Sequence, residues 1–236
     1  MNFGKKDPTK RDLVCAAVVG KKGNGKSSLM AEIAEIYMDE MLSVGKENPK
    51  YLQRAKVLIF VPMPTISRAF QKYKEITLDE LVKGVMVKGK RRRWVRGIRY
   101  IKPPNEDIKT LEAYMLAITK HFKNGLWIMD EANSWLKKTG DLPKWQLLPF
   151  TQHRNFSVEI YFCCHRLRDV KQEIRGHFWK YVIFKSNESP VDANYLREHE
   201  FPENCDEMAE MFMRVRHTHY EPDEQVQYFE IFDAAL

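Results

Sequence analysis

The chain has 236 residues, a hydrophobic content of 44% and a formal net charge of +7. This length suits one α/β domain that buries its own core, so we expect residues 1–236 to form a single domain. No apolar run approaches the ~18 residues of a membrane span and no secretory signal is visible, so we expect neither a transmembrane segment nor export. Three of the four cysteines lie in apolar runs, which indicates a reducing compartment without disulfides. The positive charge favours a polyanionic partner.

The first predicted element is a buried strand over 13–19, followed by a glycine-rich loop and a helix with apolar residues at helical spacing over 29–38. Residues 20–28, GKKGNGKSS, match the phosphate-binding pattern G-x-x-x-x-G-K-[ST] in full. Backbone N–H groups of such a loop and the helix N-terminus face the phosphates. We therefore predict a nucleoside triphosphate site formed by Gly20, Gly23, Asn24, Gly25, Lys26, Ser27 and Ser28.

Two side chains of this loop have distinct expected tasks. Lys26 reaches the β- and γ-phosphates, and the Ser27 hydroxyl binds Mg²⁺. The stretch Thr9-Lys10-Arg11-Asp12 matches a guanine-reading pattern, but it precedes the first strand instead of following a late one. We treat that match as chance and expect ATP as the nucleotide.

Strand-like and helical stretches then alternate along the chain, which predicts a mainly parallel sheet flanked by helices. The expected strands cover residues 56–61, 126–129, 158–164 and 179–184. The expected helices cover residues 66–73, 107–122, 132–138, 145–154 and 170–175. Residues 211–232 alternate around a turn and predict a closing hairpin.

Residues 83–104 form a basic segment that we expect to be a hairpin inserted in this frame. Its cationic side chains suit contacts with DNA phosphates, and a tryptophan among them suits stacking on a base or sugar. The alternative is a solvated hairpin whose charges protect an edge strand. The candidate DNA-binding residues are Lys90, Arg91, Arg92, Arg93, Trp94 and Arg96.

A pair of carboxylates follows the apolar run 126–129. Asp130, at the tip of a buried strand, is placed to bind the water shell of the magnesium ion. Glu131 is placed to orient the attacking water or to take its proton. Together with the glycine loop, this pair predicts hydrolysis of the bound triphosphate.

Phosphoryl transfer also needs a positive charge near the γ-phosphate, often an arginine from a neighbouring subunit. Arg154, between a predicted helix and strand, is the first candidate and Arg175 the second, with Arg166 and Arg168 as further possibilities. His165 follows the strand 158–164 at the sheet edge where ligands bind. It serves either as a sensor of the γ-phosphate or as an ordinary hydrogen-bonded histidine.

The segments GKKGNGKSS, LWIMDEAN and HRNFSVEIYFCCHRLRDVKQEIRG together resemble the FtsK/HerA superfamily of DNA-pumping ATPases, especially its viral branches. The resemblance covers roughly residues 13–185. It implies a RecA-like P-loop NTPase fold and a ring of subunits, commonly six, in which Arg154 is donated in trans. It also implies that His165 is the sensor, where the family usually has glutamine, and that Asp169…Ile174-Arg175 is the downstream element.

Two viral branches compete. One comprises the genome-packaging ATPases of internal-membrane icosahedral viruses, which implies double-stranded DNA and capsid vertex proteins as partners and a place in the host cytoplasm or virion. The other comprises zonula occludens toxin-like ATPases of filamentous phage assembly and export, which usually carry a membrane-spanning helix. The absence of such a helix favours packaging, while HRNFSVEI resembles the second branch. A small-molecule kinase and a non-enzymatic nucleotide-bound scaffold remain open alternatives.

Overall fold

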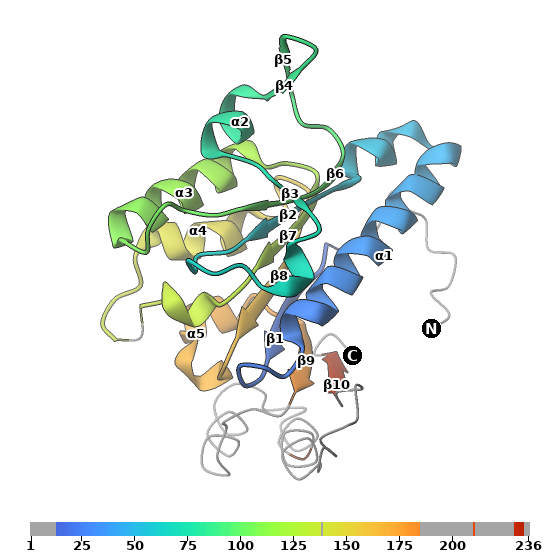
Figure 1. Ribbon diagram of the computed structural model, residues 1–236. Coiled ribbons are helices and arrows are strands. Elements are labelled where there is room, and N and C mark those ends of the chain that lie inside the picture. Colours follow the sequence, from blue (N-terminus) through green and yellow to red (C-terminus); the bar gives the residue numbers. More distant parts are fainter. Residues whose placement is uncertain (1–12, 138, 185–209, 211–228, 234–236) are drawn as a thin grey trace.

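The computed structural model describes residues 13–137, 139–184, 210 and 229–233. Its main feature is an eight-stranded sheet in the order β10-β9-β1-β8-β7-β2-β6-β3 (Figure 1). All neighbouring pairs are parallel except β10 with β9. The strands are β1 (Cys15–Val19), β2 (Lys56–Phe60), β3 (Lys74–Glu75), β6 (Gly97–Ile101), β7 (Gly125–Met129), β8 (Val158–Cys164), β9 (Lys180–Phe184) and β10 (Phe229–Asp233).

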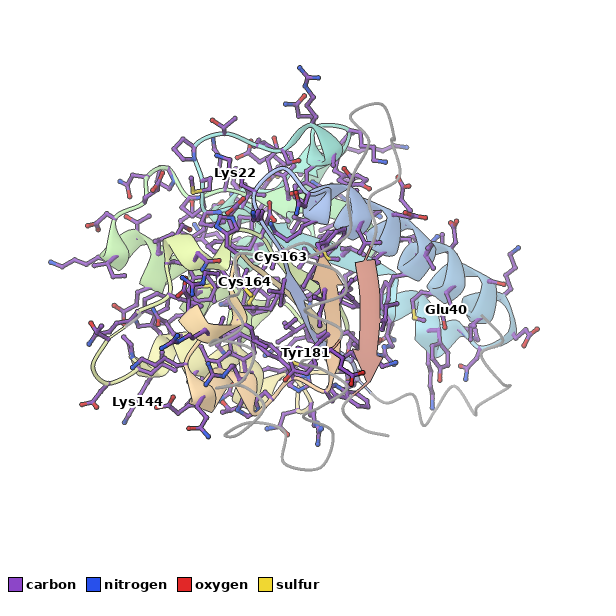
Figure 2. All side chains as sticks on the ribbon, turned by 90° about the horizontal axis from the view of Figure 1, so that it is seen from below. Lys22, Glu40, Lys144, Cys163, Cys164 and Tyr181 are labelled. Carbon is purple, nitrogen blue, oxygen red and sulfur yellow. The ribbon has the colours of Figure 1, made fainter. Side chains whose placement is uncertain are left out.

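Helices cover both faces of this sheet (Figure 1). One face carries α1 (Lys26–Glu47) and the 3₁₀ helix η2 (Pro49–Arg54), and the other carries α3 (Ile108–His121), α4 (Lys144–Gln152) and α5 (Gln172–Arg175). Strand β8 shows why the sheet needs both layers, because its side chains alternate. Phe162 and Cys164 belong to the apolar cluster under α3 and α4, and Cys163 belongs to the one under α1 (Figure 2).

The predicted α/β frame, a mainly parallel sheet flanked by helices, is confirmed and is consistent with a RecA-like fold. Two predicted helices are wrong. Residues 66–73 contain only the 3₁₀ turn η3 (Arg68–Phe70), because the chain extends directly afterwards into β3 beside β6. Residues 132–138 contain only the 3₁₀ turn η4 (Ala132–Ser134), because Trp135 turns into the core and packs edge-on against Phe60 and Phe162.

The basic hairpin is shorter than predicted. Strands β4 (Val85–Val87) and β5 (Lys90–Arg92) pair with each other, whereas residues 97–101 are β6 of the main sheet. Lys88 and Gly89 both have positive φ, as a two-residue hairpin turn requires. Gly84 also has positive φ, and a Cβ there would lie 2.7 Å from the Arg92 carbonyl oxygen. The hairpin projects beyond α2 (Leu78–Lys83) (Figure 1).

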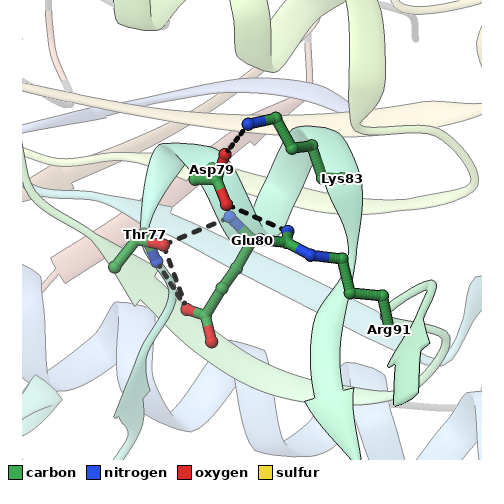
Figure 3. Close-up of polar contacts among 5 residues, drawn as sticks. All are labelled: Thr77, Asp79, Glu80, Lys83 and Arg91. Atoms are coloured by element: carbon green, nitrogen blue, oxygen red, sulfur yellow. Dashed lines mark hydrogen bonds and ion pairs between the residues drawn. The ribbon is translucent and has the colours of Figure 1, made fainter. Parts of the chain in front are cut away.

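Helix α2 is attached to the hairpin through its own first turn (Figure 3). Thr77 and Glu80 form a capping box, in which the Glu80 N–H donates to Thr77 Oγ1 at 3.1 Å and the Thr77 N–H donates to Glu80 Oε2 at 3.0 Å. Asp79 pairs with Lys83 on the same helix and with Arg91 of β5 at 2.9 Å. The carboxylate of Asp79 therefore ties the hairpin to α2.

Most of the predicted hairpin over 211–232 lies outside the described residues. Its end is described as β10, which pairs with β9. The single-domain organisation of residues 1–236 stays a prediction. Among the residues that are described, no helix is both long enough and apolar enough to cross a bilayer.

Two glycines give a matched test of the packing. A Cβ on Gly125, in β7, would lie 2.6 Å from the Lys56 carbonyl oxygen and 2.8 Å from the Phe122 ring. A Cβ on Gly176 would meet its nearest atom at 3.5 Å, and its φ of −60° suits any residue. Gly125→Ala should lower the free energy of unfolding by about 1–3 kcal/mol through overpacking. Gly176→Ala should leave it unchanged or raise it by up to about 1 kcal/mol. Urea titrations measure both, and equal midpoints would contradict the packing at β7.

Candidate functional site

The glycine loop lies between β1 and α1, where a parallel strand ends and a helix begins; Lys22 marks it in Figure 2. Gly25 is the N-cap of α1 in the left-handed conformation and provides no capping side chain. The first N–H groups of a helix have no partner within the helix. A 22-residue helix thus presents uncapped donors and the positive end of its dipole at the loop. This arrangement suits a bound phosphate.

Lys26 is buried, with 5% of its surface exposed. Its Nζ donates to the carbonyl oxygens of Gly20, at 2.7 Å, and of Lys21, at 2.8 Å. The Gly20 N–H in turn donates to the Cys164 carbonyl oxygen of β8 at 3.1 Å. The ammonium group therefore lies inside a loop that is already folded and fixed to the sheet.

Ser27 and Asp130 meet across the site. Ser27 Oγ donates to Asp130 Oδ2 at 3.4 Å, although the residues are 103 positions apart. Asp130 is 3% exposed, and its N–H donates to the Phe60 carbonyl oxygen at 3.0 Å. Burial, followed by the charge of Glu131, raises the Asp130 pKa to about 6, while Lys26 and the Ser27 hydrogen bond oppose the shift. A hydroxyl and a carboxylate side by side are the oxygen ligands that Mg²⁺ takes from proteins, so these two residues fit the ion.

No group of three or more His, Cys, Asp or Glu side chains suited to a metal ion occurs among the described residues.

Glu131 has a backbone conformation that few residues with a side chain adopt, with φ 48° and ψ 45°. Such a conformation costs on the order of 1–3 kcal/mol and is found mostly at functional sites. The turn directs its carboxylate to His165, whose Nε2 lies 2.8 Å from Glu131 Oε2. The two side chains are half-buried.

His165 sits at the carboxyl end of β8. Burial lowers its pKa, with the charges of Lys26 and Lys22 adding to the shift and Glu131 opposing it. Its backbone N–H donates to Asn133 Oδ1 at 2.5 Å. Sequence reasoning did not identify Asn133, because only the spatial neighbourhood of η4 and β8 reveals its contact.

The strand order explains how these residues meet. β8 lies between β1, which leads into the loop, and β7, which ends at the carboxylates. The carboxyl ends of parallel strands lie at one sheet edge, so His165 is placed between Lys26 and Glu131. We call this the nucleotide edge. Arg166 and Arg168 follow His165 along the chain at this same edge.

Arg154 lies at the opposite edge of the sheet, before the first residue of β8. The seven residues of β8 separate it from the nucleotide edge by roughly 20 Å. Its side chain is exposed and lines a cavity of about 520 Å³ together with Phe150, Thr151, His153, Gly176, His177, Phe178 and Trp179. The structure therefore does not bring Arg154 to the site of its own chain.

Arg175 does not fit the predicted role in a neighbour's site. It is 5% exposed, and its Nη1 donates to the carbonyl oxygens of Val170, at 2.7 Å, and Leu167, at 3.4 Å. A guanidinium group that holds its own loop together inside the protein is not available to another subunit. Arg175 is a structural residue of the segment around α5.

Trp94 is also corrected. The prediction placed its ring on a DNA base or sugar, but the side chain is 7% exposed and stacks on Phe122, with ring centroids 5.9 Å apart. Its Nε1 donates to the Arg96 carbonyl oxygen at 2.6 Å. The ring anchors the chain after the hairpin to the core. The charged members of the predicted set, Lys90, Arg91, Arg92, Arg93 and Arg96, are exposed.

Comparison with solved structures gives the same fold. The genome packaging NTPase B204 from Sulfolobus turreted icosahedral virus 2, in complex with AMPPCP, aligns with a TM-score of 0.58 at 16% identity, over 95% of this chain and 93% of that one. B204, the DNA-packaging ATPase from Sulfolobus turreted icosahedral virus, gives 0.54 at 16% identity, over 93% and 92%. The resemblance to viral P-loop ATPases is thus confirmed at the level of the fold.

The N-terminal domain of zonular occludens toxin from Neisseria meningitidis aligns less well, with a TM-score of 0.39 at 13% identity, over 75% of this chain and 79% of that one. No family model matches the sequence, and no curated protein matches it.

The buried Asp130 carboxyl predicts a pH-dependent stability. Below about pH 4 this group is neutral in both the folded and the unfolded chain, so it costs nothing. As the pH rises from about 4 to the folded pKa of about 6, the carboxyl ionises in the unfolded chain but stays neutral in the folded one, and roughly 2–3 kcal/mol of folding free energy is lost. Asp130→Asn should therefore stabilise the ligand-free protein by that amount at pH 7.5 and by much less at pH 4.5.

Urea unfolding at the two pH values measures this difference. Ser134→Ala is a control, since Ser134 is exposed and its hydroxyl donates only to the Glu131 carbonyl oxygen. If Asp130→Asn raises the free energy of unfolding by the same amount at both pH values, burial of an ionised Asp130 carboxylate is not the cause of the increase.

Proposed function

We propose that the protein is an ATP-hydrolysing motor that translocates double-stranded DNA into a preformed viral capsid. The observation that carries this proposal is the meeting of Lys26, Ser27, Asp130, Glu131 and His165 at one sheet edge. The loop and helix supply N–H donors for the phosphates, and the carboxylates supply what hydrolysis needs in addition to binding.

Each residue has a defined task in this proposal. Lys26 transfers its hydrogen bonds from the loop carbonyl oxygens to the β- and γ-phosphates. Ser27 and Asp130 hold the magnesium ion, which offsets the charge on the transferring group when bound. Glu131 takes a proton from the attacking water as the oxygen–phosphorus bond forms and the bond to the β-phosphate oxygen breaks. His165, in contact with Glu131, orients that carboxylate and responds to the γ-phosphate.

Arg154 serves the site of a neighbouring copy in this proposal. It lies on the sheet edge away from its own loop, and the structure describes no carboxylate paired with it, so its guanidinium is free to reach outward. A head-to-tail contact that places one copy's Arg154 edge against the next copy's nucleotide edge forms a ring when the rotation between copies closes. We propose a homo-oligomeric ring, most simply a hexamer.

DNA packaging is favoured over other uses of ATP by two observations. The described fold aligns over nearly the whole length of both chains with proteins named as genome- and DNA-packaging ATPases. The exposed basic hairpin also suits a polyanionic track. The partners in this proposal are the viral genome and the proteins of the capsid vertex, in the host cytoplasm or in the virion.

Filamentous phage assembly is the second candidate, and it rests on the likeness of residues 153–160 to that branch. Fractionation separates the two functions, because an export ATPase would sediment with host membranes and a packaging ATPase with capsids. A small-molecule kinase lacks support, because the sequence shows no recognisable lid or acceptor site.

Glu131→Gln tests the hydrolytic step. The change removes the proton acceptor and keeps the shape, so turnover should fall by about 10²–10⁴-fold while nucleotide affinity stays within a few-fold. Phosphate release is measured with and without double-stranded DNA, and binding of a non-hydrolysable analogue is measured by calorimetry. Turnover equal to wild type would refute the role of Glu131, and wild-type turnover that ignores DNA would refute the motor.

Mixing two inactive variants tests the donation of Arg154 in trans. Arg154→Ala alone should lose about 10³-fold or more in turnover. Its mixture with Glu131→Gln should recover activity, because roughly a quarter of the interfaces then join an intact Glu131 to an intact Arg154. Lys144→Ala, at the other end of α4, is the control and should retain full activity. No recovery in a mixture that still assembles would exclude the shared site.

A further inference from the structure

The exposed positive charge extends beyond the hairpin. At the C-terminal end of α3, Lys120 is exposed, and His121 and Lys123 are partly exposed. Lys120 lies in the last turn of α3, and Lys123 follows the extended residue Phe122 directly after the helix. The carbonyl ends of a helix favour cations, which accounts for basic residues there in structural terms. The helix end alone does not explain why three basic residues lie here beside further cations.

The stack of Trp94 on Phe122 brings a further cation to this place. Phe122 directly follows α3, and Trp94 directly follows Arg93. The exposed guanidinium of Arg93 is therefore held beside the end of α3. The tryptophan predicted to contact DNA acts instead as an anchor that joins the hairpin strand β5 to the helix end.

The cations gathered at the end of α3 have no carboxylate partners among the described residues. Burial and the positive charge of Arg93 lower the pKa values of Lys56 and Lys123 to about 8 each. The pKa of His121 is lowered by burial and then by Lys120, Lys123 and Arg93. Lys56 donates to the Lys123 carbonyl oxygen, and Lys123 donates to the Thr119 carbonyl oxygen at 2.9 Å. In the described part of the chain, no carboxylate pairs with any of these cations.

The hairpin continues this charge outward. Lys88, Lys90 and Arg92 are exposed, while Arg91 is neutralised by Asp79. From Lys90 to Arg93 the extended chain covers roughly 10 Å. That length matches about three phosphates along one strand of a duplex, at ~3.4 Å each. The spacing of the charges thus suits a linear polyanion.

We infer that the hairpin and the end of α3 form one phosphate-binding surface, made of Lys88, Lys90, Arg92, Arg93, Lys120 and Lys123, that binds the backbone of double-stranded DNA. We call it the two-limb surface. The inference rests on the proposed function, for which it names the contact with the substrate, and it adds the α3 limb that the sequence pattern did not indicate.

This surface is distant from the hydrolytic site of its own chain. The five residues of β7 lie between the end of α3 and Asp130, a separation of roughly 17 Å. Substitutions of the exposed cations should therefore change DNA binding and leave the DNA-independent ATPase rate as it is.

Lys120→Gln and Lys109→Gln form a matched pair for the test. Both residues are exposed, both lie on α3, and they are eleven positions or roughly 16 Å apart. Each change removes one positive charge. DNA affinity is measured by fluorescence anisotropy with a labelled duplex of random sequence, over a range of salt concentrations.

Lys120→Gln should reduce the slope of log K against log salt by about 0.9 and weaken binding by about 8-fold at 0.1 M salt, whereas Lys109→Gln should change neither. Arg93→Gln combined with Lys120→Gln should double the change in slope. Arg91→Gln should have a smaller effect than Arg92→Gln, because Asp79 already offsets the Arg91 charge.

The outcomes separate the surface from the function. If wild type binds no DNA, both this inference and the proposed motor are refuted. If wild type binds DNA and hydrolyses ATP, but Lys120→Gln behaves like Lys109→Gln, only the α3 limb is refuted. If poly-glutamate competes as well as DNA at equal charge, the surface recognises acidic protein instead of nucleic acid.

Discussion

The contact between Ser27 and Asp130 is the constraint on which the rest of the site depends. It joins the first turn of α1 to the end of β7, although β8 separates β7 from β1 in the sheet. These two residues come within hydrogen-bond distance because the parallel strands β1, β8 and β7 end at the same edge of the sheet. Helices pack on both faces of the sheet, α1 on one and α3 and α4 on the other, and Asp130 is buried between these layers. The layers that stabilise the sheet therefore also create the buried environment of the Asp130 carboxylate.

The local signals of the chain were sufficient for the strands, the loop and the carboxylate pair. The segment GKKGNGKSS predicts a glycine-rich loop whose backbone N–H groups face phosphates, a pattern that few other functions require. An apolar run that ends in carboxylates indicates where a buried strand ends. Strand order was not predictable in the same way, since the position of β8 depends on contacts between residues more than 100 positions apart. The contacts of Glu131 with His165, and of His165 with Asn133, follow from that order and were therefore hidden as well.

The residues that misled the prediction share one cause. Trp94 and Arg175 belong to types that are common at functional surfaces, but both are buried and held by backbone carbonyl oxygens. Residue type and position in a basic or arginine-containing stretch do not indicate which way a side chain turns. Packing decides that, as it does for Trp135, whose burial replaced a predicted helix by a 3₁₀ turn.

The bonds of Lys26 with the Gly20 and Lys21 carbonyl oxygens have a consequence for affinity. These bonds restrain the curvature of the loop, so an incoming polyphosphate meets donors that already converge. Association then exchanges one set of partners of the ammonium group for another, and the chain loses little conformational entropy in the process. A preorganised loop therefore binds phosphates more tightly than a loop that must become ordered on binding, because ordering would reduce the net binding free energy.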